Sequence, residues 1–289
     1  MAQNINLNAS PYFDDFDASS SYQRVLFKPG TPIQARELTT LQSILQNQVE
    51  QFGKHFFKEG SVVIPGQIAY DPDYFYVQID ANHLGVPVEI YLEALVGQTI
   101  KGQISGVKAK VVNYITANVS ERGNATLYVK YQTGSENDEG ENGNQKTTFE
   151  SGENLVVTTD VKYSLSTIRS ESTFATTLLT DAIGDGSVAK IADGVYFIRG
   201  FFVNVPAQNV ILDQYGDTPS YRVGLFIDEA ISVASSENSD LFDNARGFSN
   251  FAAPGADRLK ITTTLIKKSL DDLNDEDFIE LLRIENGIV

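Results

Sequence analysis

The sequence predicts a mainly β protein with one long amphipathic helix, an α+β class in which strands dominate. Three observations support this. A single long segment, residues 32–58, repeats its apolar residues at helical spacing. The other apolar runs are short, rich in β-branched and aromatic residues, and bounded by Gly, Pro or Asp. The chain is also 42% hydrophobic, with enough Gly and Pro for many turns, which suits a loop-rich protein with a real core.

Residues 1–24 are predicted to form an extended N-terminal arm. The segment is polar and rich in Asn, Asp and Ser, yet it carries four aromatic residues within eleven positions: Tyr12, Phe13, Phe16 and Tyr22. We expect these rings to dock onto a protein surface. The alternative is a disordered tail, which so many aromatic residues disfavour.

The predicted helix begins with a recognisable capping sequence. Thr31 is a suitable N-cap, Pro32 fits the first helical position, and Gln34 completes a T-x-x-Q capping box. The apolar stripe of the helix consists of Leu38, Leu41, Leu45, Phe52 and Phe56. We expect this stripe to pack on the helix's own domain, in preference to a self-associating coiled coil, because the heptads are few.

The other faces of the helix carry Gln and Thr more than charge, which is unusual for a helix bathed in water. Such faces suit a surface that other protein covers. The candidate interface residues are therefore the four aromatic residues of the arm together with Gln34, Gln42, Gln46, Gln48 and Phe52.

The chain is predicted to contain an inserted module. A β-rich main domain would span residues 25–95 and 160–289, with strands at 61–66, 74–80 and 86–95 and a turn at Asp71-Pro72-Asp73. Residues 96–159 would form a small β-barrel or sandwich within it, because short strands there alternate with Gly turns. The stretch 134–145 has no apolar residue and is predicted to be a flexible loop.

Further elements are expected after residue 160. Residues 172–192 would hold a short helix and a Gly-rich turn at 184–187. Two strands hinged at Arg199-Gly200 would follow. Asn286-Gly287 is a strong hairpin signal. The predicted return strand stops after two residues, so we expect the natural polypeptide to continue past Val289.

Composition argues against several classes of partner. The net charge is −16, which repels nucleic acid and anionic membranes. No apolar run approaches the roughly 20 residues of a membrane helix, and the N-terminus lacks the pattern of a signal peptide. Cysteine is absent, which removes disulfides and thiolate chemistry. We expect a protein that is made and used without Sec export.

The sequence holds no recognisable catalytic, cofactor or metal constellation, so the prediction is that this chain is not an enzyme. Its two histidines, His55 and His83, have no ligand or nucleophile motif around them. The acidic clusters 14–17, 71–73 and 181–185 are read as solvated surface or turn caps. An aromatic run at Tyr70 and 74–76 suits either a sugar-stacking shelf or ordinary packing.

Five segments closely resemble a known family. Residues 8–46 (NASPYFDDFD…YQRVLFKPGTPIQARELTTLQSILQ, with a gap) and FKEGSVVIPG (57–66) resemble the start of large virion structural proteins of contractile-tailed phages, notably phages of marine cyanobacteria. Residues 193–208, 219–225 and 250–261 resemble later blocks of the same family, in the expected order. The resemblance covers about half of the chain. Family members are usually far longer than this chain.

The resemblance implies a structural component of the tail baseplate, in the peripheral wedge or fibre-attachment region, that is made in the host cytoplasm and acts in the virion by subunit packing. The implied partners are other baseplate or tail subunits in an oligomer, with a homotrimer as one option. No catalytic residue carries over. The alternatives are a receptor- or glycan-binding module at a tail-fibre base and, third, a polysaccharide-cleaving enzyme.

Overall fold

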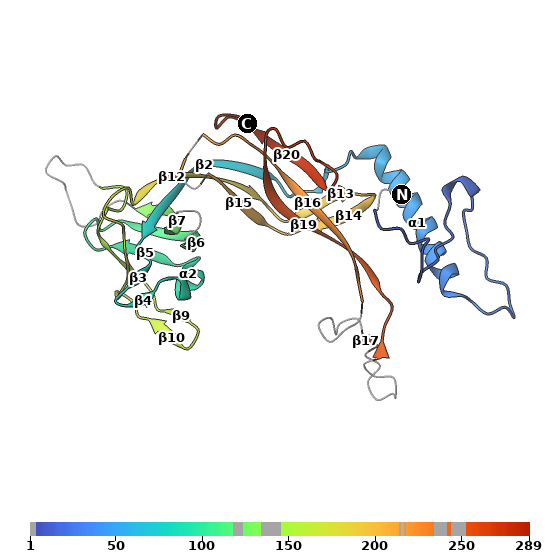
Figure 1. The fold of residues 1–289 in the computed structure, drawn as a ribbon, viewed down its shortest axis with the longest axis horizontal. Coiled ribbons are helices and arrows are strands. Elements are labelled where there is room, and N and C mark those ends of the chain that lie inside the picture. Colours follow the sequence, from blue (N-terminus) through green and yellow to red (C-terminus); the bar gives the residue numbers. More distant parts are fainter. Residues whose placement is uncertain are drawn as a thin grey trace.

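The computed structural model describes residues 4–117, 124–133, 146–213, 215–216, 218–233, 242–243 and 253–289. Strands account for 46% and helices for 13%, which confirms the mainly β prediction. The molecule is elongated (Figure 1): a lobe of short strands lies at one end, long strands form the middle, and the main helix with the N-terminal arm lies at the other end. The predicted flexible loop 134–145 lies outside the described residues.

The described residues contain two α-helices, α1 (Ala35–Phe56) and α2 (Glu89–Leu95), and a short 3₁₀ helix, η1 (Ala18–Ser20). The prediction of a strand over 86–95 is wrong, because α2 occupies most of that segment. Val88, Tyr91, Leu92 and Leu95 recur at helical spacing, and all four are buried in the core of the lobe. Val86–Pro87 alone forms a short strand, β4.

The largest sheet has eight strands, and every neighbouring pair is antiparallel. In spatial order its strands are β11 (Thr173–Thr176), β8 (Asn154–Val157), β5 (Thr99–Gly102), β6 (Lys108–Ile115), β7 (Ala125–Thr133), β2 (Ile68–Ile79), β12 (Ile183–Ile191) and β15 (Gln208–Asp213). No pairing between described strands closes this sheet into a barrel, although an isolated bridge joins Ile79 to Thr177. The four strands within 96–159 thus lie in one sheet with β2 and β12.

Two predictions about these strands are wrong. The turn expected at Asp71-Pro72-Asp73 is part of β2, whose pairing with β12 shifts register between Gly186 and Val188. A bulge of this kind tolerates the missing N–H of Pro72. The short helix and Gly-rich turn expected over 172–192 are instead β11 and β12. Gly184 of β12 admits a bulky neighbour, since a Cβ on it would lie 2.6 Å from the Tyr76 hydroxyl.

Two three-stranded sheets complete the middle of the molecule. One has the order β1 (Val62–Ile64), β13 (Gly194–Ile198), β14 (Phe201–Val205), and the other has β16 (Tyr221–Ser232) between β19 (Arg258–Ser269) and β20 (Phe278–Ile284). The short pairs are β3 (Asn82–His83) with β4, β9 (Val161–Tyr163) with β10 (Ser166–Ile168), and β17 (Phe242–Asp243) with β18 (Ala253–Pro254).

Both predicted tight turns are confirmed. Arg199 and Gly200 join β13 to β14 with φ angles of 51° and 81°. Asn286 and Gly287, with φ angles of 51° and 77°, turn the chain after β20, and a bridge between Glu285 and Ile288 closes that turn. Positive φ at both central residues is the geometry of the two-residue hairpin turn that Asn-Gly favours.

The buried side chains form two main cores and a small junction. One core fills the lobe and includes Val77, Leu92 and Leu127; the other lies in the middle and includes Ile191, Val223 and Leu265. The junction is the stacked pair Tyr74–Tyr128, whose ring centroids are 4.9 Å apart, with Val188. Strands β2 and β12 contribute side chains to both cores and to the junction.

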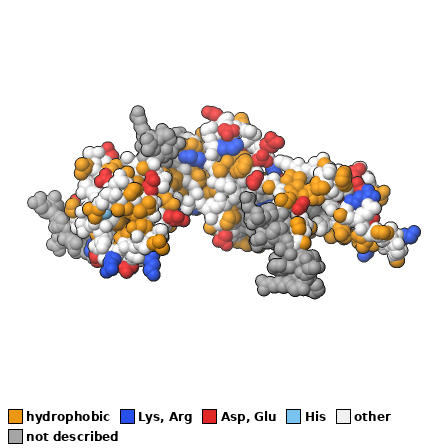
Figure 2. Space-filling view, turned by 60° about the horizontal axis from the view of Figure 1, so that its bottom comes forward, with side chains coloured by type: hydrophobic (Ala, Val, Ile, Leu, Met, Phe, Trp, Pro, Cys, Tyr) orange, Lys and Arg blue, Asp and Glu red, His pale blue; other side chains and the backbone are white. Residues whose placement is uncertain are grey.

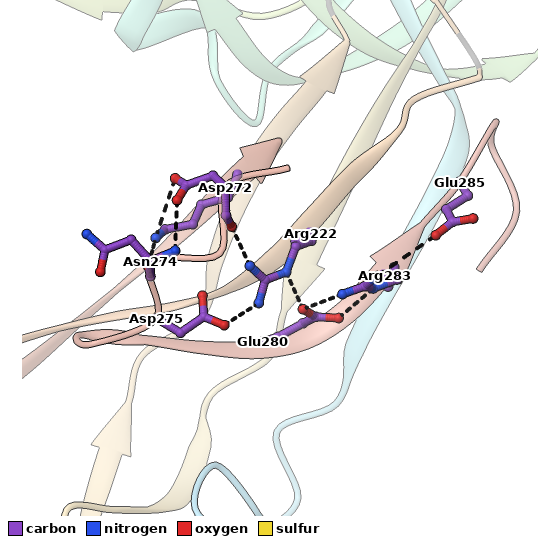
Figure 3. A network of polar contacts seen from close by, with 8 residues as sticks. Arg222, Asp272, Asn274, Asp275, Glu280, Arg283 and Glu285 are labelled. Atoms are coloured by element: carbon purple, nitrogen blue, oxygen red, sulfur yellow. Dashed lines mark hydrogen bonds and ion pairs between the residues drawn. The ribbon is translucent and has the colours of Figure 1, made fainter. Parts of the chain in front are cut away.

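A buried arginine joins β16 to the segment before β20 (Figure 3). The Arg222 guanidinium donates to the carboxylates of Asp275 (2.6 Å) and Glu280 and to the carbonyl of Asp272. Arg283 donates to the same Glu280 carboxylate, at 3.0 Å from Nε to Oε1. These partners keep the buried Arg222 charge compensated and fix the loop between β19 and β20.

Candidate functional site: the outward face of helix α1

Helix α1 begins three residues after the predicted first helical position. Its N-cap is Gln34, and a capping box joins Gln34 to Glu37, whose carboxylate accepts the Gln34 backbone N–H at 2.9 Å. The prediction that Thr31 is the cap is wrong, because Thr31 already closes a turn by donating its N–H to the carbonyl of Lys28 at 3.2 Å. Gly30 occupies that turn with φ 79°, which glycine adopts without strain.

The face of α1 that contacts its own chain is largely polar. Four residues of α1 are buried, Ser43, Ile44, Glu50 and Gly53, and Ile44 is the one large apolar side chain among them. A Cβ on Gly53 would lie 2.3 Å from Cε2 of Phe197 on β13, so glycine lets the helix backbone approach that ring. Gln46 donates from Nε2 to the carbonyl of Gly200 at 2.7 Å. The β13–β14 turn therefore holds α1 through its polar side.

Most of the large apolar residues of α1 point the other way. Five of them are well exposed: Leu38 (47%), Leu45 (55%), Val49 (41%), Phe52 (62%) and Phe56 (62%). At about 100° per residue they lie within about 60° of the helix circumference, and we call them the outward stripe. The prediction that this stripe packs on its own domain is wrong, and Leu41 is the only predicted stripe member that is half-buried. The sequence interpretation also missed Val49.

The charged residues of α1 are all engaged within the chain. Arg36 pairs with Asp15 of the arm at 3.1 Å, and Lys54 pairs with buried Glu50 at 2.6 Å. Glu37 belongs to the capping box. The outward stripe is flanked by Gln42, Gln48 and His55, so this face is neutral, although the chain as a whole carries a net charge of −16.

The N-terminal arm docks on its own chain, and its aromatic residues divide into two groups. Tyr12 and Phe16 are half-buried; the Tyr12 hydroxyl donates to Asp257 at 2.7 Å, and this hydrogen bond raises the pKa of Tyr12. Phe13 and Tyr22 are 53% and 74% exposed. Buried Asp14 accepts a hydrogen bond from Ser43 of α1, which anchors the arm to the helix. Two rings of the arm thus stay available to a partner.

The four candidate glutamines have different surroundings. Gln34 caps the helix, and Gln46 is committed to Gly200. Gln42 is exposed and borders a shallow pocket of about 220 Å³. Gln48 is exposed and donates to Gln23 of the arm at 3.4 Å. Gln42 and Gln48 therefore flank the outward stripe, whereas Gln46 lies against the chain itself.

The N-terminus is anchored by a buried ion pair that the sequence did not suggest. The Arg199 guanidinium, 6% exposed, donates to Glu229 at 2.9 Å and also to Asp277. The same Glu229 carboxylate accepts the backbone N–H groups of Asn4 and Ile5, each at 3.0 Å. One carboxylate thus ties the start of the arm to β16 and to the turn that holds α1.

The described residues show no constellation for chemistry. No group of three or more His, Asp or Glu side chains among them is placed to hold a metal ion. His83 is 3.1 Å from Thr173, and His55 packs edge-on against Phe56. Asp17 caps η1, and hydrogen bonds from Ser19 lower its pKa. No helix in the described part of the chain is both long and apolar enough to cross a bilayer.

The predicted aromatic shelf is not open to solvent. Tyr74 is 4% exposed and stacks on Tyr128, and Tyr76 lies edge-on to Tyr215 with centroids 4.8 Å apart. Phe75 points to the opposite side, where it meets Tyr131, as strand alternation predicts. These rings join the two cores to each other.

The fold and the outward stripe define a mainly β protein that presents a neutral, apolar helical surface. The chain belongs to the family described as "Domain of unknown function (DUF4815)", whose profile matches residues 10–160. The matched range contains residues 10–24 of the arm, both α-helices and strands β1 to β8. A search of curated proteins and a search of solved structures each find no match to this chain.

Proposed function

We propose that this protein is a structural component of a contractile phage tail baseplate and acts through subunit packing. The observation that carries the proposal is the outward stripe of α1. Five large apolar side chains stand in solvent on one narrow face, while a largely polar set, with Ile44 as its one large apolar member, is buried against the body of the molecule. Exposed apolar side chains contribute no stability to an isolated chain in water, whereas they stabilise a complex in which a neighbouring subunit buries them.

The energetics suit a joint that needs no cofactor. Fully burying one such side chain contributes about 1.5–3 kcal/mol, so covering the exposed half of each contributes about 1 kcal/mol. Five residues then supply about 5 kcal/mol from one partner, to which the exposed rings of Phe13 and Tyr22 add. Figure 2 shows hydrophobic side chains gathered at the end of the molecule that α1 and the arm form.

The location and the partners in this proposal come from the resemblance to virion structural proteins of contractile-tailed phages. The partners are other baseplate or tail subunits, and the site of action is the peripheral wedge or fibre-attachment region. Residues 96–159 form the inserted small module of this proposal, supported by a core cluster separate from that of the middle sheets. That lobe lies at the opposite end from α1.

The two alternatives receive less support. A glycan-binding module needs aromatic rings open to solvent, but the rings of the proposed shelf are packed between the cores. A polysaccharide-cleaving enzyme needs two carboxylates across a groove. Of the candidate acids, Asp14 bonds to Ser43, Asp15 to Arg36 and Asp71 to Lys190 at 2.8 Å, and each of these bonds serves packing.

Electron microscopy of purified phage particles that encode this chain tests the proposal. We expect density for the chain in the baseplate, with the outward stripe covered by a neighbouring polypeptide. Phage carrying Phe52→Glu should assemble poorly, whereas phage carrying Gln51→Glu, an exposed position outside the stripe, should assemble normally. Absence of the chain from particles, or an outward stripe that faces solvent in them, contradicts the proposal.

A further inference from the structure

We propose that the outward stripe of α1 is a self-association surface whose occupant is the same stripe of a second copy of this chain. This inference rests on the proposed function, and it names the partner of the site described above. The five residues follow an alternating spacing of four and three positions from Leu45 to Phe56, with Leu38 one heptad earlier. That spacing is the seam of a coiled coil.

The width of the stripe favours another helix as the partner. A helix that packs on a globular core presents an apolar arc of at least about 100°, whereas a coiled-coil seam is narrower. The outward stripe spans about 60° at about 100° per residue. The 22 residues of α1 make it about 33 Å long, so a helix of equal length covers the stripe from end to end.

Charge favours an identical copy over a basic partner. Two copies of a chain with a net charge of −16 repel each other unless they meet at a neutral face. The outward stripe and its flanks Gln42, Gln48 and His55 carry no carboxylate, and the four charged residues of α1 have partners within the chain. If the partner were a basic protein, the contact face of this acidic chain would be expected to carry carboxylates, and the outward stripe carries none.

The area is sufficient for a stable pair. The rings of Phe52 and Phe56, each 62% exposed, offer about 100–150 Å² apiece, and the three aliphatic side chains offer about 60–100 Å² apiece. With the flanking polar residues, two copies together bury about 1,200 Å², which is the lower end of the range for specific interfaces. Isolated exposed residues do not reach this area.

The middle of α1 gives a test that does not depend on helix direction. Leu45 lies within one residue of the midpoint of α1 (Ala35–Phe56), so in a symmetric pair whose helices overlap along their full length it lies next to its own copy whether the helices run parallel or antiparallel. The chain has no cysteine, and Leu45→Cys therefore introduces the only thiol. Mild oxidation should convert this variant to a disulfide-linked dimer, because the two Cα atoms lie within bridging distance.

Gln51 supplies the matched control, since it is exposed on α1 about 130° around the helix from the centre of the stripe. Gln51→Cys should remain unlinked under the same oxidation. By sedimentation equilibrium the full wild-type chain should be a dimer or a larger oligomer. Leu45→Glu and Phe52→Glu should weaken association about 30-fold or more, and Gln51→Glu should leave it unchanged.

Circular dichroism separates loss of association from loss of fold, because the substituted side chains already face solvent and the variants should keep the wild-type spectrum. A wild-type chain that is monomeric, or oligomers that are indifferent to both Glu variants, overturns the inference. If a different polypeptide covers the outward stripe in phage particles, self-association falls and the proposed function stands. If the chain is absent from particles yet self-associates through Leu45, the proposed function falls and this inference stands.

Discussion

The ring of Phe197 occupies the position that a side chain at residue 53 of α1 would need. A Cβ atom on Gly53 would lie 2.3 Å from Cε2 and 2.8 Å from Cζ of Phe197. The ring itself is 1% exposed and packs against Phe57 and Phe202. It has little room to move aside, so this contact fixes how closely α1 approaches β13, and it determines which face of the helix is turned outward.

Replacing Gly53 by alanine should destabilise the protein. In an open helix the change would stabilise by about 1 kcal/mol, but overpacking against Phe197 costs about 1–3 kcal/mol. We therefore expect a lower urea midpoint for Gly53→Ala and an unchanged or higher one for Gln51→Ala. The double variant Gly53→Ala/Phe197→Leu should show a favourable coupling. A midpoint for Gly53→Ala above that of the wild type contradicts the close contact.

Removing the Arg199 side chain should weaken the anchor of the N-terminus. Arg199→Ala leaves Glu229, whose side chain is 3% exposed, without its cation, and breaking a buried ion pair costs about 3–5 kcal/mol. Both residue types have a Cβ, so the φ of 51° strains them alike.

The control for this prediction is Arg36→Ala, which breaks the exposed ion pair with Asp15 and should change the free energy of unfolding by less than about 1 kcal/mol. Denaturant titration monitored by fluorescence measures both variants. If both variants lose the same free energy of unfolding, burial does not make the Arg199 ion pair more stabilising than an exposed one.

Glu153→Gln should be costly although the two residues have the same shape. The buried Glu153 carboxylate accepts hydrogen bonds from the N–H groups of Ile104 (3.0 Å), Ser105 (2.9 Å) and Glu150 (2.6 Å). An amide nitrogen at one of these oxygen positions cannot accept, which leaves buried donors unpaired at about 1–3 kcal/mol. Thermal melting should detect the loss, and Glu171→Gln, at an exposed turn, serves as the control.

The sheet formed by β16, β19 and β20 should lose stability in acid. The hydrogen bond from Arg222 lowers the pKa of Asp275, and hydrogen bonds from Arg283 and then Arg222 lower the pKa of Glu280. A carboxylate with a lowered folded-state pKa contributes stability above its unfolded pKa, and that contribution is lost as the pH falls through the folded value. Arg222 stays charged throughout, because the same partners raise its pKa.

Thermal melts between about pH 7 and pH 2 check this prediction. The melting temperature should fall below about pH 4, and the fall should be shallower in the double variant Asp275→Asn/Glu280→Gln, which starts lower at pH 7. If wild type and double variant follow parallel curves, these two carboxylates do not account for the acid sensitivity.

Local signals in the sequence predicted the fold class, the long helix and the tight turns, because each depends on neighbouring residues. Arg199-Gly200 and Asn286-Gly287 turn as expected, since positive φ is a local property. Residues 89–95 were misread because a short apolar run suits a buried helix or a strand equally well, and the helical spacing of Val88, Leu92 and Leu95 decides between them only weakly.

The candidate site was located from the sequence, but its orientation was not. The apolar residues of α1 revealed an amphipathic helix, and amphipathicity normally points the apolar face inward. Here Gly53 and Phe197, which are far apart in the sequence, set the opposite orientation. A glycine within the last turns of a helix is the only local hint of such a close approach, and it does not identify the partner ring.

The shared strands β2 and β12 have a mechanical consequence. Each strand runs without a break from the core of the lobe to the core of the middle sheets. The two strands pair with each other as antiparallel neighbours over much of their length. A pull applied at one end of the molecule is therefore transmitted as shear along paired backbones, with no flexible linker to absorb it. The lobe and the middle sheets should therefore respond to an applied force as one rigid unit. Neither part can be removed without interrupting a strand that also belongs to the other part.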